Sequence, residues 1–174
     1  MQREDFELLV TTYGKDILRF CRFTTCNNEE GDELYQETML YLLKNIKKIR
    51  FEEAAKSYAI SSALYLWKSK KRKALRRHKI IPFESLETIN ETEGDCIADN
   101  TSSVEDTVLY DEEVKKLQIC INALPDKYRL PLIMYYSANI QVKEIAKALK
   151  LPEATIKTRL KRAKEQLKKH MDEN

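Results

Sequence analysis

The sequence predicts an all-α fold, with two small helical domains joined by an acidic linker. Only three of the 174 residues are glycine and four are proline, so few residues interrupt a helix. Apolar residues recur at steps of three and four along two long segments, which is the spacing of one helical face. Residues 81–102 are polar and lack this spacing. We therefore predict domains over residues 1–80 and 103–174, each long enough for a small core.

Three helices are predicted in the first domain. The first ends at Asn27 and Asn28, residue types that favour turns and helix starts. The third runs from about Glu53 into a strongly basic stretch. The apolar faces of the three helices are formed, in chain order, by Phe6, Leu9, Val10, Tyr13, Ile17, Phe20 and Cys21; by Tyr35, Met39, Leu42 and Ile46; and by Ala55, Tyr58, Ala59, Ser62 and Leu66.

The second domain is also predicted to be helical. An apolar seam leads to Pro125, which suits the start of a helix over 126–136. Pro131 lies inside that helix, where it removes a backbone hydrogen bond and favours a kink. A short helix over 142–149 and a final one over about 153–171 complete the domain.

Charge is distributed unevenly along the chain, although the formal net charge is only +3. Residues 66–80 hold eight Lys or Arg and no acid, and residues 81–114 hold eleven Asp or Glu and no base. Residues 143–170 hold ten basic residues against three acids. Either basic run alone is compatible with an ordinary solvated helix face. Two such runs flanking an acidic stretch favour phosphate-rich partners, which attract Lys and Arg.

Composition also argues against several classes of protein. No uncharged apolar run reaches the roughly 18 residues of a membrane helix. Residues 1–5 include acids where a signal peptide needs a basic and then an apolar stretch, so a cytoplasmic protein is expected. The four cysteines lack zinc-site spacing, and no Gly-rich phosphate loop occurs. We expect no membrane insertion, no metal, no cofactor and no enzymatic activity.

Residues 142–167 have the spacing of a helix-turn-helix motif, with residues 150–152 as the turn. In the last helix, steps of four, three and four direct Ile156, Leu160, Ala163 and Leu167 to the core. A rotation of about 100° per residue then places basic and hydroxyl side chains on the opposite side. Such a face suits the major groove of duplex DNA. An ordinary helical hairpin with a solvated basic face is the alternative.

Five stretches of this chain together resemble the bacterial sigma-70 family, most nearly its short extracytoplasmic function (ECF) class. Residues 124–129, 143–146 and 155–163 are similar to region 4 of those factors. Residues 32–38 resemble the core-binding helix of region 2, and residues 55–79 resemble the helices that engage the −10 promoter element. The resemblance covers nearly the whole chain except the acidic linker.

The resemblance implies that the chain binds core RNA polymerase, through its β′ and β subunits, and promoter DNA. An anti-sigma factor is a further possible partner, because many relatives are held inactive by one. In the family, the linker threads the polymerase channel that later carries RNA; a self-repelling tether is the alternative here.

Three sets of residues carry the implied contacts. The polymerase-binding set consists of Asp32, Glu33, Gln36, Glu37 and Leu40. The set for the single-stranded −10 element consists of Tyr65, Trp67, Lys68, Lys70, Lys71, Arg72, Arg76 and Arg77, in which aromatic rings and cations alternate as unpaired bases require. The set for the duplex −35 element consists of Thr155, Lys157, Thr158, Lys161 and Arg162.

Some positions depart from the family pattern, and two rival functions stay open. Tyr65 stands where many relatives have Asn, and Lys150 and Ala154 stand where many have Gly. A stand-alone helix-turn-helix regulator is one rival, although such proteins usually bind DNA as dimers. A helical adaptor with solvated basic faces is the other. Neither rival needs the helix over residues 32–38.

Overall fold

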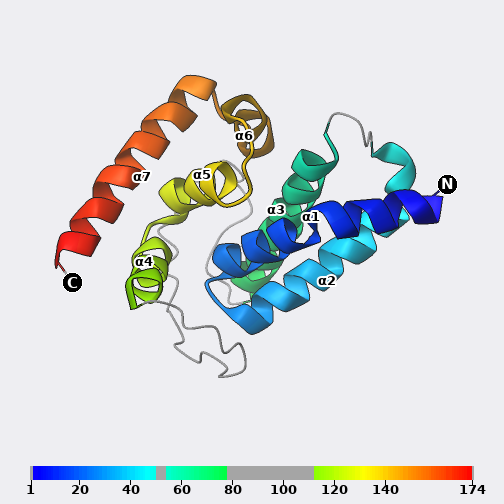
Figure 1. Cartoon of the computed structure of the whole chain (residues 1–174), viewed down its shortest axis with the longest axis horizontal. Coiled ribbons are helices and arrows are strands. Elements are labelled where there is room, and N and C mark those ends of the chain that lie inside the picture. Colours follow the sequence, from blue (N-terminus) through cyan, green and yellow to red (C-terminus); the bar gives the residue numbers. More distant parts are fainter. Residues whose placement is uncertain (1, 50–53, 78–111, 174) are drawn as a thin grey trace.

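The computed structural model describes residues 2–49, 54–77 and 112–173, and every regular element in these ranges is a helix (Figure 1). This confirms the all-α prediction. The N-terminal half contains α1 (Gln2–Thr25), α2 (Asn28–Lys44), the 3-10 turn η1 (Ile46–Lys48) and α3 (Ala55–Arg77). The C-terminal half contains α4 (Glu112–Asn122), α5 (Asp126–Tyr136), α6 (Val142–Leu149) and α7 (Glu153–Glu173). The predicted linker, residues 81–102, lies outside the described residues.

The corner between α1 and α2 is set by local backbone chemistry. Cys26 turns the chain with a positive φ of 57°. Asn27 then caps α2, because its side-chain oxygen accepts a hydrogen bond from the Glu30 backbone N–H at 3.1 Å. A Cβ atom on Gly31 would lie 2.6 Å from the Arg22 Cα, so the two helices approach closely only because this residue is glycine.

The predicted helix-turn-helix is present in the C-terminal half. Helix α6 ends at Lys150, which adopts a left-handed conformation with φ 55° and ψ 44°. The Leu151 N–H donates to the Ala146 carbonyl at 3.0 Å and closes the turn into α7. A left-handed Lys costs on the order of 1 kcal/mol relative to Gly. The substitution is therefore compatible with the motif, and Ala154 lies within the regular helix α7.

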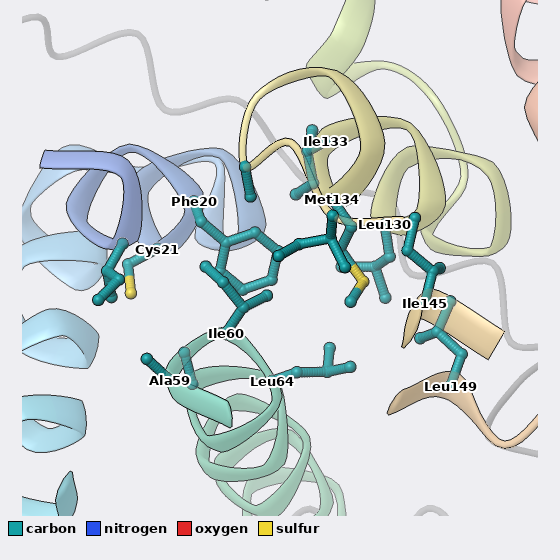
Figure 2. Close-up of a cluster of buried hydrophobic side chains, with 14 of the residues drawn as sticks. Phe20, Cys21, Ala59, Ile60, Leu64, Leu130, Ile133, Met134, Ile145 and Leu149 are labelled. Atoms are coloured by element: carbon teal, nitrogen blue, oxygen red, sulfur yellow. The ribbon is translucent and has the colours of Figure 1, made fainter. Parts of the chain in front are cut away.

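Apolar residues of the two halves form one continuous cluster (Figure 2). Helix α5 is buried on several sides and lies between α7 and the N-terminal helices. Its Met134 side chain, 1% exposed, meets Phe20 of α1 and Ile60 of α3, both fully buried. A smaller cluster of Leu124, Leu132 and Ala163 belongs to the C-terminal half alone. The two halves are thus packed against each other, which periodicity alone had not predicted.

Residues 2–49, 54–77 and 112–173 lack two features. No helix there is long and apolar enough to cross a membrane. In the same ranges, no group of three or more His, Cys, Asp or Glu side chains lies close enough together to hold a metal ion.

We expect Gly31→Ala to destabilise the protein by about 1–3 kcal/mol, because the added methyl group forces α1 and α2 apart. The midpoint of urea unfolding, followed by circular dichroism, measures this change. Gly14→Ala is the matched control, since its nearest neighbours are the Tyr35 hydroxyl at 3.2 Å and the Val10 Cγ1 at 3.6 Å. Equal stability of the two variants would contradict the close approach at Gly31.

Candidate functional site

The predicted polymerase-binding residues lie on the side of α2 that faces away from the core. Leu34, Thr38 and Leu42 of the same helix are buried. Leu40 is 58% exposed, one of several large apolar side chains that reach solvent in the described residues. Three other members of the set are also exposed: Glu33, Gln36 and Glu37. The fifth member, Asp32, is half-buried.

Two acids of this set are held by bases of neighbouring helices. Arg22 forms a bidentate ion pair with Asp32. Its Nε atom lies 2.7 Å from Oδ1, and its Nη2 atom lies 3.2 Å from Oδ2. Lys70 Nζ lies 2.7 Å from Glu37 Oε1, so a predicted DNA-binding cation is paired with a predicted polymerase-binding acid. The surface of α2 and the basic face of α3 therefore adjoin each other.

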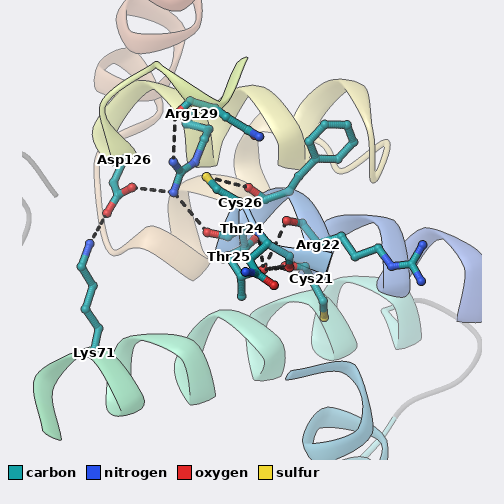
Figure 3. A network of polar contacts seen from close by, with 11 residues as sticks. Cys21, Arg22, Thr24, Thr25, Cys26, Lys71, Asp126 and Arg129 are labelled. Atoms are coloured by element: carbon teal, nitrogen blue, oxygen red, sulfur yellow. Dashed lines mark hydrogen bonds and ion pairs between the residues drawn. The ribbon is translucent and has the colours of Figure 1, made fainter. Parts of the chain in front are cut away.

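The predicted −10 set divides into two groups on α3. Tyr65 is 57% exposed, with its ring centroid 6.5 Å from that of Tyr41. The exposed cations of the set are Lys70, Arg76 and Arg77. The remaining members are half-buried, and Lys71 among them pairs with Asp126 of the C-terminal half (Figure 3): they are Trp67, Lys68, Lys71 and Arg72. The resemblance to the sigma-70 family had placed all eight residues in one set.

Cations of both halves converge around Lys68. Burial is the largest effect on its pKa, which is lowered from the usual value, and Arg72, Lys150 and Arg159 lower it further. Asp126 acts in the opposite direction. Because Lys150 and Arg159 belong to the helix-turn-helix, the basic face of α3 meets the basic turn of that motif. Like charges therefore face each other where the two halves join.

The basic face of α7 projects into solvent, as predicted. Ile156, Leu160 and Ala163 are buried. The opposite side carries the exposed residues Lys157, Thr158, Lys161 and Arg162, and Thr155 is half-buried. The Thr158 hydroxyl donates to the Ala154 carbonyl at 3.0 Å, which leaves its oxygen able to accept a further hydrogen bond.

Several residues near these surfaces were not singled out by the sequence analysis. Leu43 is 47% exposed one helical turn after Leu40, so the apolar part of the α2 surface is larger than predicted. The sequence did contain a signal for this, because Leu43 follows Leu40 by three residues and therefore lies on the same side of the helix. Arg129 is fully buried, although an Arg in a helical sequence gives no indication of burial.

Comparison with known proteins agrees with this arrangement. Residues 9–77 match the sequence family described as "Sigma-70 region 2", and residues 115–167 match "Sigma-70, region 4". Together these matches cover most of the chain and fall on α1–α3 and α4–α7. The chain belongs to the sigma-70 family.

Full-length relatives indicate the type of sigma factor, and solved structures share the fold. Two curated relatives from Bacillus subtilis are ECF RNA polymerase sigma factors. SigX is 23% identical over 97% of this chain and 84% of its own length, and SigW is 25% identical over 97% and 90%. The sigma factor RpoE, in complex with the anti-sigma factor NepR from Bartonella quintana, has a TM-score of 0.77 at 14% identity, covering 97% of this chain and 98% of that one. CnrH, in complex with the cytosolic domain of CnrY, has a TM-score of 0.65 at 14% identity, with 97% and 88% covered. The chain is an ECF-type sigma factor.

The Lys70–Glu37 pair is expected to contribute about 0.5 kcal/mol to the free energy of unfolding, because both side chains are more than two-fifths exposed. A double-mutant cycle of Lys70→Ala and Glu37→Ala, read out by urea unfolding, measures the coupling. The coupling should fall in 0.5 M salt, which screens exposed charges. Fully additive effects at low salt would show that the pair does not form in solution.

Proposed function

We propose that this ECF sigma factor directs core RNA polymerase to a promoter and helps to open the promoter DNA. Three surfaces of the chain make the contacts that this function requires. The observation that carries the proposal is the pair of solvent-facing surfaces at opposite ends of the chain. One is the exposed Leu40 among acids and amides on α2, and the other is the basic face of α7. A DNA-binding regulator needs only the second.

The α2 surface is the proposed polymerase contact. Leu40 supplies an apolar anchor, and Gln36 and Glu37 on the turn before it supply polar contacts around the anchor. Small interfaces often depend on such an anchor surrounded by polar groups that exclude water. Arg22 orients Asp32 at the start of the same helix.

The basic face of α3 is the proposed site for the melted −10 strand. Tyr65 offers an exposed ring for base stacking, and Lys70, Arg76 and Arg77 offer cations for the phosphates. Trp67 and Lys71 lie together, with the ammonium 5.0 Å from the ring centroid. Both are half-buried, and the Lys71 ammonium also pairs with Asp126 of α5.

The exposed face of α7 is the proposed reader of the −35 duplex. Lys161 and Arg162 can reach guanine edges or phosphates, and the Thr158 oxygen can accept a hydrogen bond from a base. Ile145 of α6 and Ile156 of α7 are fully buried in one apolar cluster, so the two helices of the motif share a core beneath this face.

We assign no catalytic role to the chain, because phosphodiester bond formation belongs to the polymerase. We therefore propose that the chain acts in the cytoplasm, together with the polymerase. An inhibitory partner is also proposed. Support comes from the structure of a similar fold bound to an anti-sigma factor.

Purified chain mixed with core polymerase should form a stable complex and start transcription at its promoters. Gln36→Ala combined with Glu37→Ala should weaken the complex roughly tenfold or more, since both side chains lie beside the Leu40 anchor. Fluorescence anisotropy of labelled sigma factor measures this affinity. Glu113→Ala combined with Gln118→Ala is the matched control, because these residues are exposed on α4. A chain that neither binds nor initiates would overturn the proposed function.

Arg162→Ala should weaken recognition of promoters that contain a −35 element, because the guanidinium group is proposed to contact a base. The expected loss of binding free energy is about 1–3 kcal/mol. Initiation rates from matched templates with intact and scrambled −35 elements measure the effect. Lys168→Ala is the control, because Lys168 is exposed farther along α7. Equal rates for wild type and Arg162→Ala on the intact element would remove Arg162 from the reading face.

A further inference from the structure

Tyrosine rings of α2 and α3 meet where these two helices lie side by side (Figure 1). Tyr65 of α3 is 57% exposed, and its ring centroid lies 6.5 Å from that of Tyr41 on α2. The two ring planes are inclined at 42°, so neither ring lies flat on the other and covers its face. Tyr41 is half-buried and was not among the residues that the family resemblance assigned. Two aromatic faces therefore adjoin each other at this surface.

A third tyrosine, Tyr58, supports the Tyr41 ring. Tyr58 precedes Tyr65 by seven residues, so both side chains lie on the same face of α3, two turns apart. Burial raises the pKa of the Tyr58 hydroxyl above its usual value, and electrostatic interaction and a hydrogen bond with the Tyr41 side chain raise it further. Tyr41 is thus held at its hydroxyl by Tyr58 and beside its ring by Tyr65. A ring that is already held loses less conformational entropy when a ligand stacks on it.

Cations lie on either side of the two rings. One face of α2 carries Glu37, Tyr41 and Lys44 at steps of four and three residues. Glu37 Oε1 lies 2.7 Å from Nζ of Lys70 on α3, which places this exposed ammonium at one end of the face. Lys44 is exposed at the other end. Aromatic rings flanked by cations are what single-stranded nucleic acid requires, because bases stack on the rings and phosphates attract the cations.

The geometry favours an opened strand over a duplex or a protein partner. Bases of a duplex are stacked on one another, and their faces become available to a ring only when the strand is opened. The 6.5 Å between the ring centroids exceeds the rise of about 3.4 Å per nucleotide in a stacked strand, so it suits bases that are no longer stacked together. Leu40, the proposed polymerase anchor, lies about 100° around α2 from Tyr41. The tyrosines therefore form a surface distinct from the polymerase contact.

We propose that Tyr41 and Tyr65 form a two-ring platform on which two unpaired bases of the −10 strand stack, and that Tyr58 positions Tyr41 for this contact. The inference rests on the proposed function, because it takes the basic face of α3 as the single-strand site. It adds to that site a ring from α2, the helix that is proposed to bind polymerase. Each ring accepts one base, so loss of either ring removes one stacking contact and leaves the other.

Photocross-linking in the complex with core polymerase tests the stacking directly. The probe is an oligothymidylate of about ten nucleotides in which one central base is 5-iodouracil, a base that cross-links on irradiation to an aromatic ring stacked on it. Mass spectrometry of the digested complex should place cross-links on both Tyr41 and Tyr65. Cross-links on Tyr65 alone, or on neither tyrosine, would overturn the platform.

Single variants test the contribution of the ring against that of the hydroxyl. Tyr41→Leu removes the ring but keeps an apolar side chain, and it should lower the affinity for the labelled oligothymidylate roughly tenfold, as loss of one stacked base does. Tyr41→Phe and Tyr58→Phe keep the ring of Tyr41 and remove its hydrogen bond, so each should stay within about threefold of wild type. Fluorescence anisotropy measures these affinities, with core polymerase alone as the background. A loss for Tyr41→Phe as large as that for Tyr41→Leu would show that the ring does not stack.

The double variant Tyr41→Leu with Tyr65→Leu distinguishes two stacked bases from one. If each ring holds its own base, the double variant should bind at least roughly fivefold more weakly than Tyr65→Leu alone. If Tyr41 only supports the Tyr65 ring, the double variant binds no more weakly than Tyr65→Leu, and the platform is wrong.

Tyr136→Leu is the matched control, because Tyr136 is also an exposed tyrosine, at the end of α5. Equal losses for Tyr41→Leu and this control would contradict the proposal. Affinity for core polymerase is measured without the oligonucleotide, and urea unfolding checks that each variant is folded. Weakened polymerase binding with unchanged strand affinity would assign Tyr41 to the polymerase contact and overturn the platform.

Transcription by the wild-type chain with core polymerase is measured in parallel. A chain that initiates normally but gives no cross-link to Tyr41 overturns only the platform. A chain that never initiates overturns the proposed function itself.

Discussion

The packing of α5 against α1 and α3 is the contact on which the rest of the structure depends. It buries Phe20, Ile60 and Met134 almost completely. Burying such side chains contributes about 1.5–3 kcal/mol each, more than an exposed ion pair provides. The apolar surfaces therefore supply most of the attraction between the two halves. The polar groups at Asp126 and Arg129 contribute mainly by fixing one orientation, since an unpaired buried charge is strongly disfavoured.

This arrangement explains why the three surfaces differ in accessibility. The α2 surface and the α7 face point into solvent. Either can therefore bind a partner while the two halves stay packed against each other. The α3 face is the exception, because Lys71 pairs with Asp126 of the C-terminal half and Lys68 lies near Lys150 and Arg159.

Helix positions and faces followed from the sequence because both depend on local spacing. The short helix over 142–149 was predicted with the bounds that α6 has, and apolar steps identified buried Ile156, Leu160 and Ala163 on α7. The exposed state of Lys157, Lys161 and Arg162 follows from the same periodicity. By contrast, the eight basic and aromatic residues of α3 were predicted to act together, yet only some are exposed. Periodicity identifies a polar face but does not say whether another part of the chain covers it.

The sequence by itself determined the all-α class, the helix-turn-helix and the exposed basic face of α7, because each is encoded by residues within a few turns of one another. Tertiary structure alone decided how the two halves meet. Lys71 and Asp126 are 55 residues apart, and Thr24 and Arg129 are 105 apart. A charged residue looks the same in sequence whether it is solvated or buried against a distant carbonyl. Its partner is set by the packing of apolar faces, which fixes both positions at once.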